Sequence, residues 1–267
     1  MPIQPSLSDT PSVFVAWQDP GTREWHTIGR LSRTVDGLYE FGFTRGADKL
    51  RDVAKRLFNS NLDGNFFSTG LTAMFRNKIP SRSRSDFQKM AAWLNLRGDE
   101  SDFDLLGKFG LIPGSDGLLV YSAPKIEQGR YSIEFFLHGI RHTHGESDSR
   151  HLHGDVLAWC EVAKVGDQLL ALLDVQNPFD PNSVALRAEG GTIAVGYVPR
   201  FYAGDIRSIL GQPECARSAK FEILRNNADA PLQFRVLCRF TSNVPRGFAQ
   251  LDDIDHQMRP ALAPLAD

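Results

Sequence analysis

Residues 174–200 read DVQNPFDPNSVALRAEGGTIAVGYVPR, and this stretch decides how the second half of the chain folds. Two runs of strand-forming residues, 183–188 and 192–198, flank the turn tripeptide EGG, which predicts a β-hairpin. Before the hairpin, Pro178 and Pro181 stiffen a loop between strands. After it, we expect a helix at about 203–210, ended by a glycine and a proline. The stretch therefore predicts a rigid loop, a hairpin and a helix in succession.

The composition of the chain limits the kinds of protein it can be. Its 267 residues suit one large or two modest domains, and a hydrophobic content of 42% is enough for buried cores. The formal net charge of −2 is unlike that of a protein that coats duplex DNA, so any contact with nucleic acid is expected to be local. Three cysteines without CxxC spacing favour buried thiols in a reducing compartment: Cys160, Cys215 and Cys238.

The start of the chain, MPIQPSLSDTPS, is polar and rich in Pro and Ser. It lacks the basic region and apolar stretch of a signal peptide, and no apolar run approaches the ~20 residues of a membrane helix. We therefore expect a cytoplasmic protein with a flexible N-terminus and no membrane contact.

Many short strands are predicted in the second half of the chain. Besides the hairpin, the expected strands are 131–140, 156–162, 167–175, 219–225 and 232–240. Short strands with tight turns and one small helix are typical of a compact β-barrel. The fold class expected for the whole chain is mainly β with a few helices.

The first half is predicted to form an α+β domain. Expected strands lie at 12–18, 24–32, 37–44 and 118–122, and helices are expected at 48–58 and directly after a capping box at Ser85 and Gln88. The predicted division is a flexible N-terminus (1–11), an α+β domain (12–122), a linker (123–129), a barrel (130–245) and a polar tail (246–267).

The combination of NPFDPNSVA, a short hairpin and GYVPR resembles the HIRAN domain, over about residues 130–245. This resemblance implies an OB-like barrel that binds single-stranded DNA and, in helicase-fused members of the family, captures a free 3′ end. By position it implies nucleic-acid contacts from six residues: Arg141, His142, Phe179, Asp180, Tyr197 and Arg200.

The chemistry of these residues suits that role. Phe179 offers a ring on which a base can stack, worth ~1–3 kcal/mol. Asp180 repels phosphate but accepts a hydrogen bond from a terminal hydroxyl, so it can select an end rather than a sequence. Arg141 can pair with phosphate through two N–H groups, whereas His142 replaces the usual tyrosine of the family. The alternatives are a simple turn at NPFDPN, core roles for Phe179 and Tyr197, and a surface ion pair at Arg141.

The stretch from Gly29 to Thr44, with its pattern GRL…GLYEFGFT, resembles the N-terminal part of HipA-type kinases. The chain has no kinase lobe, so the resemblance implies a domain that docks a protein partner or a second nucleic-acid segment. A basic run in this half is a secondary candidate for backbone contacts, or a solvated helix approach: Arg76, Lys78, Arg82 and Arg84.

Five histidines crowd residues 138–153: His138, His142, His144, His151 and His153. Neutral imidazoles are zinc ligands, but the spacing matches no finger and no cysteine is near, so we expect a polar loop and no metal. No phosphate-binding GxxxxGK[ST] loop or GxSxG elbow is present, and Cys160 lies in an apolar run. We therefore expect no catalysis and no cofactor.

The sequence thus favours a non-catalytic protein that binds single-stranded DNA or a 3′ DNA end. The processes implied are DNA repair, mobile-element defence or toxin–antitoxin regulation. The alternative is a protein–protein interaction module, such as an antitoxin-like regulator, without DNA binding. A third interpretation is a metal-dependent nuclease that uses the histidine cluster. The oligomeric state stays open.

Overall fold

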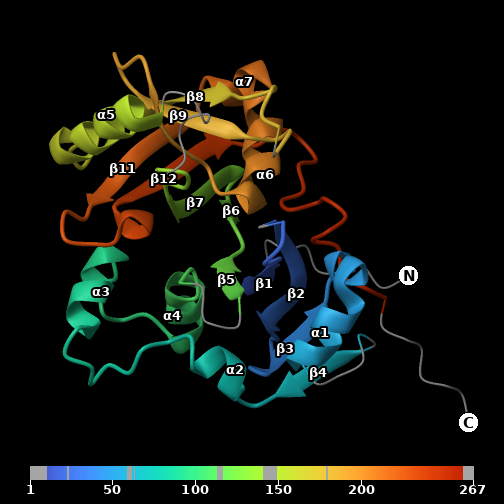
Figure 1. Cartoon of the computed structure of the whole chain (residues 1–267). Helices are drawn as coiled ribbons and strands as arrows, with labels where there is room; N and C mark the ends of the chain where they lie inside the picture. The colour runs from blue at the N-terminus through green and yellow to red at the C-terminus, as the bar shows by residue number, and fades with distance from the viewer. Residues whose placement is uncertain are drawn as a thin grey trace, which may run out of the picture. The chain divides into compact units, whose positions relative to one another are not determined.

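The computed structural model describes residues 11–22, 24–58, 62, 64–112, 117–140, 149–178 and 180–260, without the side chains of 149–154. These residues form two compact units (Figure 1). Unit 1 takes residues up to Phe87, Arg97–Ala123 and those from Gln250 onward. Unit 2 takes Gln88–Leu96 and Pro124–Ala249. Each unit contains one antiparallel sheet, so the mainly β fold class predicted from the sequence is confirmed.

Unit 1 is a five-stranded sheet with helices. Its strands, in the order β4-β3-β2-β1-β5, are β1 (Ser12–Gln18), β2 (Trp25–Arg33), β3 (Tyr39–Phe43), β4 (Asn65–Ser68) and β5 (Leu118–Ser122). Its helical segments are a 3-10 turn (Arg45–Leu50), α1 (Arg51–Phe58), α2 (Ala73–Arg76) and α4 (Asp102–Phe109). The sequence predicted β1, β2, β3, β5 and the helix at 48–58 but missed β4 and α4. A capping box begins α4, where Ser101 and Asp104 exchange hydrogen bonds.

Residues 250–260, at the end of the described chain, belong to unit 1. The sequence predicted these residues as part of a polar tail. Two backbone hydrogen bonds hold this returning segment beside the end of β3: Arg45 N–H to the Gln257 carbonyl at 2.8 Å and Arg259 N–H to the Phe43 carbonyl at 3.0 Å. Together they form the antiparallel bridge between Thr44 and Met258. The close packing here requires glycine at position 46, because a Cβ there would lie 2.1 Å from the carbonyl oxygen of Thr27 and 3.1 Å from that of Asp255 in the returning segment.

A buried chain of hydrogen bonds anchors the same segment. His256 Nε2 lies 2.7 Å from the Tyr121 hydroxyl, which lies 2.7 Å from Thr27 Oγ1. On its other side, His256 Nδ1 lies 2.6 Å from a carboxylate oxygen of Asp253. The returning segment therefore ties strands β2 and β5 together through side chains as well as backbone.

Unit 2 contains a seven-stranded sheet in the order β10-β9-β8-β11-β12-β7-β6. Its strands are β6 (Lys125–Glu127), β7 (Arg130–Phe136), β8 (Gln168–Leu173), β9 (Val184–Ala188), β10 (Ala194–Tyr197), β11 (Lys220–Asn226) and β12 (Val236–Asn243). Its helices are α5 (Ser149–Val162), α6 (Arg200–Leu210), α7 (Pro213–Ala216) and a 3-10 turn (Leu232–Phe234). α3 (Phe87–Trp93) crosses the division between the units. None of the helices in the described ranges has the length and hydrophobicity needed to span a membrane.

The prediction of a strand at 156–162 is wrong, because these residues form the second half of α5. Val156 and Cys160 are buried, whereas Asp155 and Glu161 are exposed. Buried positions four residues apart fit one face of a helix, and a short apolar run cannot be assigned by periodicity alone. Asn226 of β11 donates to the carbonyls of Cys160 and Ala163, at 2.7 and 2.8 Å, so α5 lies beside β11 (Figure 1).

A single backbone pair closes the sheet of unit 2 into a barrel. His138, just beyond β7, and Tyr197, at the end of β10, exchange two N–H···O bonds of 2.9 Å each. Because β7 and β10 are otherwise separated by β12, β11, β8 and β9, this pair joins the two sides of the sheet. The barrel predicted from the density of short strands is therefore present in the structure.

Two glycines make the closing pair possible, and we call this place the seam (residues 137–139 and 196–197). Gly139 has a φ of +74°, and a Cβ there would lie 3.0 Å from Tyr197 Cδ2. At Gly196 a Cβ would lie 3.0 Å from the His138 carbonyl oxygen. Side chains at these positions would push the two strands apart.

Gly139→Ala should therefore destabilise the protein by more than its backbone conformation alone requires. Gly190, in the hairpin turn, is the matched control, because its φ is +73° and nothing lies within 4 Å of its Cβ position. Both changes place alanine in the left-handed region, at about 1–2 kcal/mol. Gly139→Ala should cost about 1 kcal/mol more, from crowding of the seam. Urea unfolding of the full chain measures both, and equal losses would show that the seam is not tight.

Candidate nucleic-acid interface

The structure describes three of the six residues predicted to contact nucleic acid: Asp180, Tyr197 and Arg200. Arg141, His142 and Phe179 lie outside the described residues, as does His144, and so do the side chains of His151 and His153. The convergence of Arg141 and Asp180 on one groove therefore stays a prediction. The described part of the site consists of the loop between β8 and β9, the seam and the first turn of α6.

The loop between β8 and β9 is ordered around Asn177. Its side-chain amide donates to Asp174 Oδ2 at 3.1 Å, and its carbonyl oxygen accepts the N–H of Asp180 at 3.1 Å. Asp180 continues the pattern, since its Oδ1 accepts the N–H of Asn182 at 2.9 Å and its carbonyl accepts that of Ser183 at 3.0 Å. These are Asx-type turns, which fix a loop without secondary structure.

Tyr197 connects this loop to the seam. Its pKa is raised, first by burial and then by the neighbouring carboxylate of Asp174, to which its hydroxyl donates a hydrogen bond. The ring is half-buried and lies over Gly139. Tyr197, Asp174, Asn177 and the backbone of Asp180 thus form one continuous set of contacts. The structure brings Tyr197 and the Asp180 loop together through two residues that the sequence analysis did not select.

The side chain of Asp180 is half-buried and uses one oxygen to cap its own turn. Its other carboxylate oxygen makes no hydrogen bond to the described residues. A carboxylate oxygen accepts hydrogen bonds from a hydroxyl donor, and its charge repels a phosphate.

Arg200 is the first residue of α6 and its side chain is exposed. A second arginine of the barrel, Arg187 of β9, donates to the Gly191 carbonyl at 2.8 Å and supports the hairpin turn instead. The described charges around the loop are therefore mixed, with Asp174 and Asp180 opposite in sign to these arginines.

His138 occupies the seam rather than a polar loop. Burial lowers its pKa to about 4, so it is neutral at pH 7. Its ring meets Phe201 of α6 edge-to-face, with centroids 6.1 Å apart. No group of three or more potential metal ligands occurs among the described residues. Zinc binding by the remaining histidines of the cluster is untested, because their side chains lie outside the described part.

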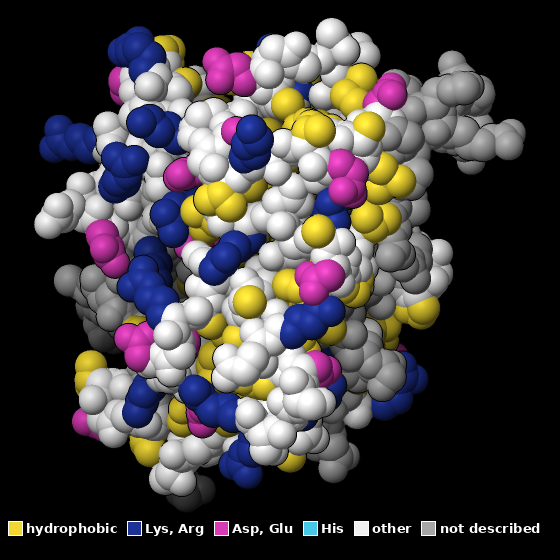
Figure 2. Space-filling view, turned by 90° about the vertical axis from the view of Figure 1, so that its left-hand side faces the viewer, with side chains coloured by type: hydrophobic (Ala, Val, Ile, Leu, Met, Phe, Trp, Pro, Cys, Tyr) yellow, Lys and Arg dark blue, Asp and Glu magenta, His cyan; other side chains and the backbone are white. Residues whose placement is uncertain are grey.

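The four residues of the predicted basic patch are each engaged within unit 1. Arg76 donates to the Leu71 carbonyl at 2.9 Å, and Lys78 donates to that of Leu118 at 2.8 Å. The remaining two contacts are Arg82 to the Glu100 carbonyl at 3.2 Å and Arg84 to both carboxylate oxygens of Asp86 at 2.8–2.9 Å. These contacts favour a structural role for the run. Basic and acidic side chains are also interspersed on the face shown in Figure 2.

All three cysteines are free and buried, as the sequence predicted. Burial raises the pKa of the Cys160 thiol, and the nearby Arg235 guanidinium opposes this only in part. A thiol with a raised pKa is a poor nucleophile at neutral pH.

No family model matches the chain, and no curated protein matches it. Among solved structures, the chain is similar to the crystal structure of the HIRAN domain of human HLTF, with 15% identity and a TM-score of 0.30. The similarity covers 42% of this chain and 74% of that chain.

The neutral His138 predicts a pH dependence of stability. The pKa of His138 falls from about 6.5 in the unfolded chain to about 4 in the folded protein. The folded protein therefore requires the neutral form of His138, and above pH 6.5 no stability is lost to protonation of this residue. As the pH falls from 6.5 toward 4, the unfolded chain binds a proton at His138 and the free energy of unfolding decreases. Between pH 7 and pH 5 the unmutated protein should lose up to about 2 kcal/mol more than His138→Asn, which cannot titrate. Urea unfolding at the two pH values measures this, and parallel losses in both proteins would contradict it.

Proposed function

We propose that the barrel of unit 2 binds single-stranded DNA and selects a free 3′ end, without catalysing a reaction. The observation that carries the proposal is the set of hydrogen bonds that holds the Asp180 loop to Tyr197 at the seam. The sequence motif NPFDPNSVA…GYVPR, with its resemblance to the HIRAN domain, supports the same interpretation.

The roles of the proposed DNA-contacting residues follow from their charge and ring chemistry. Arg141 attracts the phosphate backbone whatever the base sequence. The rings of Phe179 and Tyr197 offer stacking surfaces that do not sense the terminus of the strand. Asp180 discriminates, because a terminal hydroxyl donates to its carboxylate whereas a phosphate at the same place is repelled. The rigid loop matters because such discrimination requires the carboxylate to be in place before the strand arrives.

A second candidate function, docking of a protein partner, is favoured by the surface of β8. Leu170, Leu172 and Leu173 are 39–43% exposed, and Val175 just beyond the strand is 64% exposed. Leu170 and Leu172 share one face of β8, whereas Leu173 lies on the other face at the end of the strand. Apolar side chains of a strand normally pack against a core. Their exposure suits a partner with an apolar surface, as expected of an interaction module.

The experiment compares the affinities of the full chain for oligonucleotides ending in 3′-hydroxyl and in 3′-phosphate, by fluorescence anisotropy. The unmutated protein should prefer the hydroxyl end. Asp180→Asn keeps an oxygen that can cap Asn182 but removes the charge, so it should reduce that preference by about tenfold or more. Glu189→Ala is the matched control, since it removes an exposed carboxylate from the neighbouring hairpin.

Arg141→Ala serves as the backbone-contact variant. It should weaken both oligonucleotides alike and lower the slope of log affinity against log salt by about one unit or less. Equal affinity of the unmutated protein for both ends would refute end selection. The protein-interaction module would be favoured by two results together. Neither oligonucleotide binds, and Leu172→Ser weakens the retention of a protein partner.

A further inference from the structure

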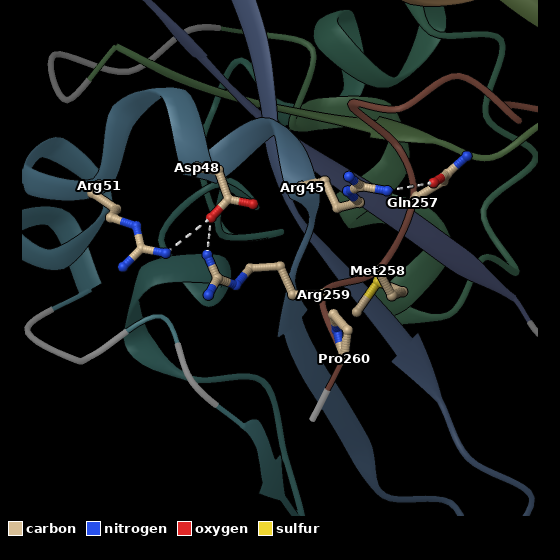
Figure 3. A pocket seen from close by; sticks show the side chains of 7 residues that line it. All are labelled: Arg45, Asp48, Arg51, Gln257, Met258, Arg259 and Pro260. Carbon is tan, nitrogen blue, oxygen red and sulfur yellow. Dashed lines mark hydrogen bonds and ion pairs between the residues drawn. The ribbon is translucent and has the colours of Figure 1, made fainter. Parts of the chain in front are cut away.

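Unit 1 contains a cavity of about 500 Å³ that the barrel site does not involve (Figure 3). It forms where the returning end of the described chain lies beside the 3-10 turn that follows β3. Four charged side chains line it: Arg45, Asp48, Arg51 and Arg259. Gln257, Met258 and Pro260 complete the lining.

The backbone fixes these residues in place. Two backbone hydrogen bonds hold the segments together: Arg45 N–H donates to the Gln257 carbonyl at 2.8 Å, and Arg259 N–H donates to the Phe43 carbonyl at 3.0 Å. Arginines more than 200 positions apart in the sequence are therefore neighbours in the fold. The hydrogen-bonded His256 lies three residues before Arg259 and anchors the same segment to the sheet.

The charges of the cavity do not balance. Three guanidinium groups face one carboxylate, which leaves a formal charge of +2 on the lining. Asp48 accepts from both Arg51 and Arg259, as Figure 3 shows, and Arg45 donates to Gln257 Oε1 at 3.3 Å. The pair between Arg51 and Asp48 is 3.3 Å long with both side chains about half exposed, so it is weak and easily exchanged.

This arrangement suits an anion with several oxygens. A guanidinium presents N–H donors in a planar fork that matches phosphate. Arg51 and Arg259 meet at Asp48, whereas Arg45 points toward Gln257 and lines another side of the same cavity (Figure 3). The net positive charge opposes a metal cation. The cavity is larger than a phosphate ion, and Met258 and Pro260 offer apolar contact to whatever carries the phosphate.

We propose that this cavity binds a phosphate group, carried by a small ligand of nucleotide size or by a nucleic-acid backbone. Arg45 and Arg51 contact the phosphate from the 3-10 turn and α1, and Arg259 contacts it from the returning segment. Asp48 holds Arg51 and Arg259 in position when the cavity is empty and competes with the incoming anion. The site does not depend on the function proposed for the barrel.

The test is calorimetric titration of the full chain with inorganic phosphate, adenosine 5′-monophosphate and adenosine. The phosphate compounds should bind and adenosine should not. Arg45→Ala and Arg51→Ala should each weaken binding about tenfold, and Arg51→Lys should have a smaller effect because it keeps the charge but loses the fork. Asp48→Asn should strengthen binding, since it removes the competing charge.

Arg56→Ala is the matched control, because Arg56 is exposed on the same helix but does not line the cavity. It should leave binding of inorganic phosphate and adenosine 5′-monophosphate unchanged. If only a single-stranded oligonucleotide binds, with a loss in Arg51→Ala but not in Arg56→Ala, the phosphate is that of a backbone. The proposal is overturned if no phosphate compound or oligonucleotide binds, or if Arg45→Ala and Arg51→Ala behave like Arg56→Ala.

Discussion

The backbone pair between His138 and Tyr197 is the interaction on which the barrel depends, because it joins the end of β7 to the edge strand β10 of an otherwise open sheet. Without it, β10 would be an edge strand with unpaired N–H and C=O groups. The close approach at this pair also restricts which residues fit beside it. Gly139 and Gly196 are required by the close approach, and His138 becomes neutral because it is buried there. Tyr197 then connects the seam to the loop between β8 and β9 through Asp174.

Unit 1 uses the same principle with different chemistry. There a returning segment makes an isolated bridge just beyond β3, and buried His256 joins it to Tyr121 and, through Tyr121, to Thr27. In both units, residues far apart in the sequence are fixed together before any ligand is present. A preformed arrangement lowers the entropic cost of binding, which matters for a chain of near-neutral charge. Long-range attraction contributes little to such a protein, so local geometry must provide affinity.

The sequence predicted those parts of the fold that depend on local signals. Turn residues marked the hairpin of β9 and β10, and alternation marked β1, β2 and β3. It failed at 156–162, where a short apolar run fits a helix or a strand equally well. It also missed the return of residues 250–260, because Tyr121, the partner that anchors His256 to the sheet, is 135 positions away. In the site, Asp180 and Tyr197 were found from a motif. Asp174 was missed because its contact to Tyr197 follows only from the closed barrel. Asn177 was missed although its bonds to Asp174 and to the Asp180 backbone are local, and an Asn followed by Pro is a turn signal that could have indicated them.

The central claim is that the seam positions the loop of residues 174–183 for a DNA strand. Hydrogen exchange of the full chain, with and without a single-stranded oligonucleotide ending in 3′-hydroxyl, tests it most directly. The amides of His138 and Tyr197 should exchange slowly in the free protein, because both donate across the seam. The oligonucleotide should slow exchange further in residues 174–183 and at the seam. Rapid exchange at His138 and Tyr197 in the free protein, or protection by DNA that leaves the loop and the seam unchanged, would contradict the account.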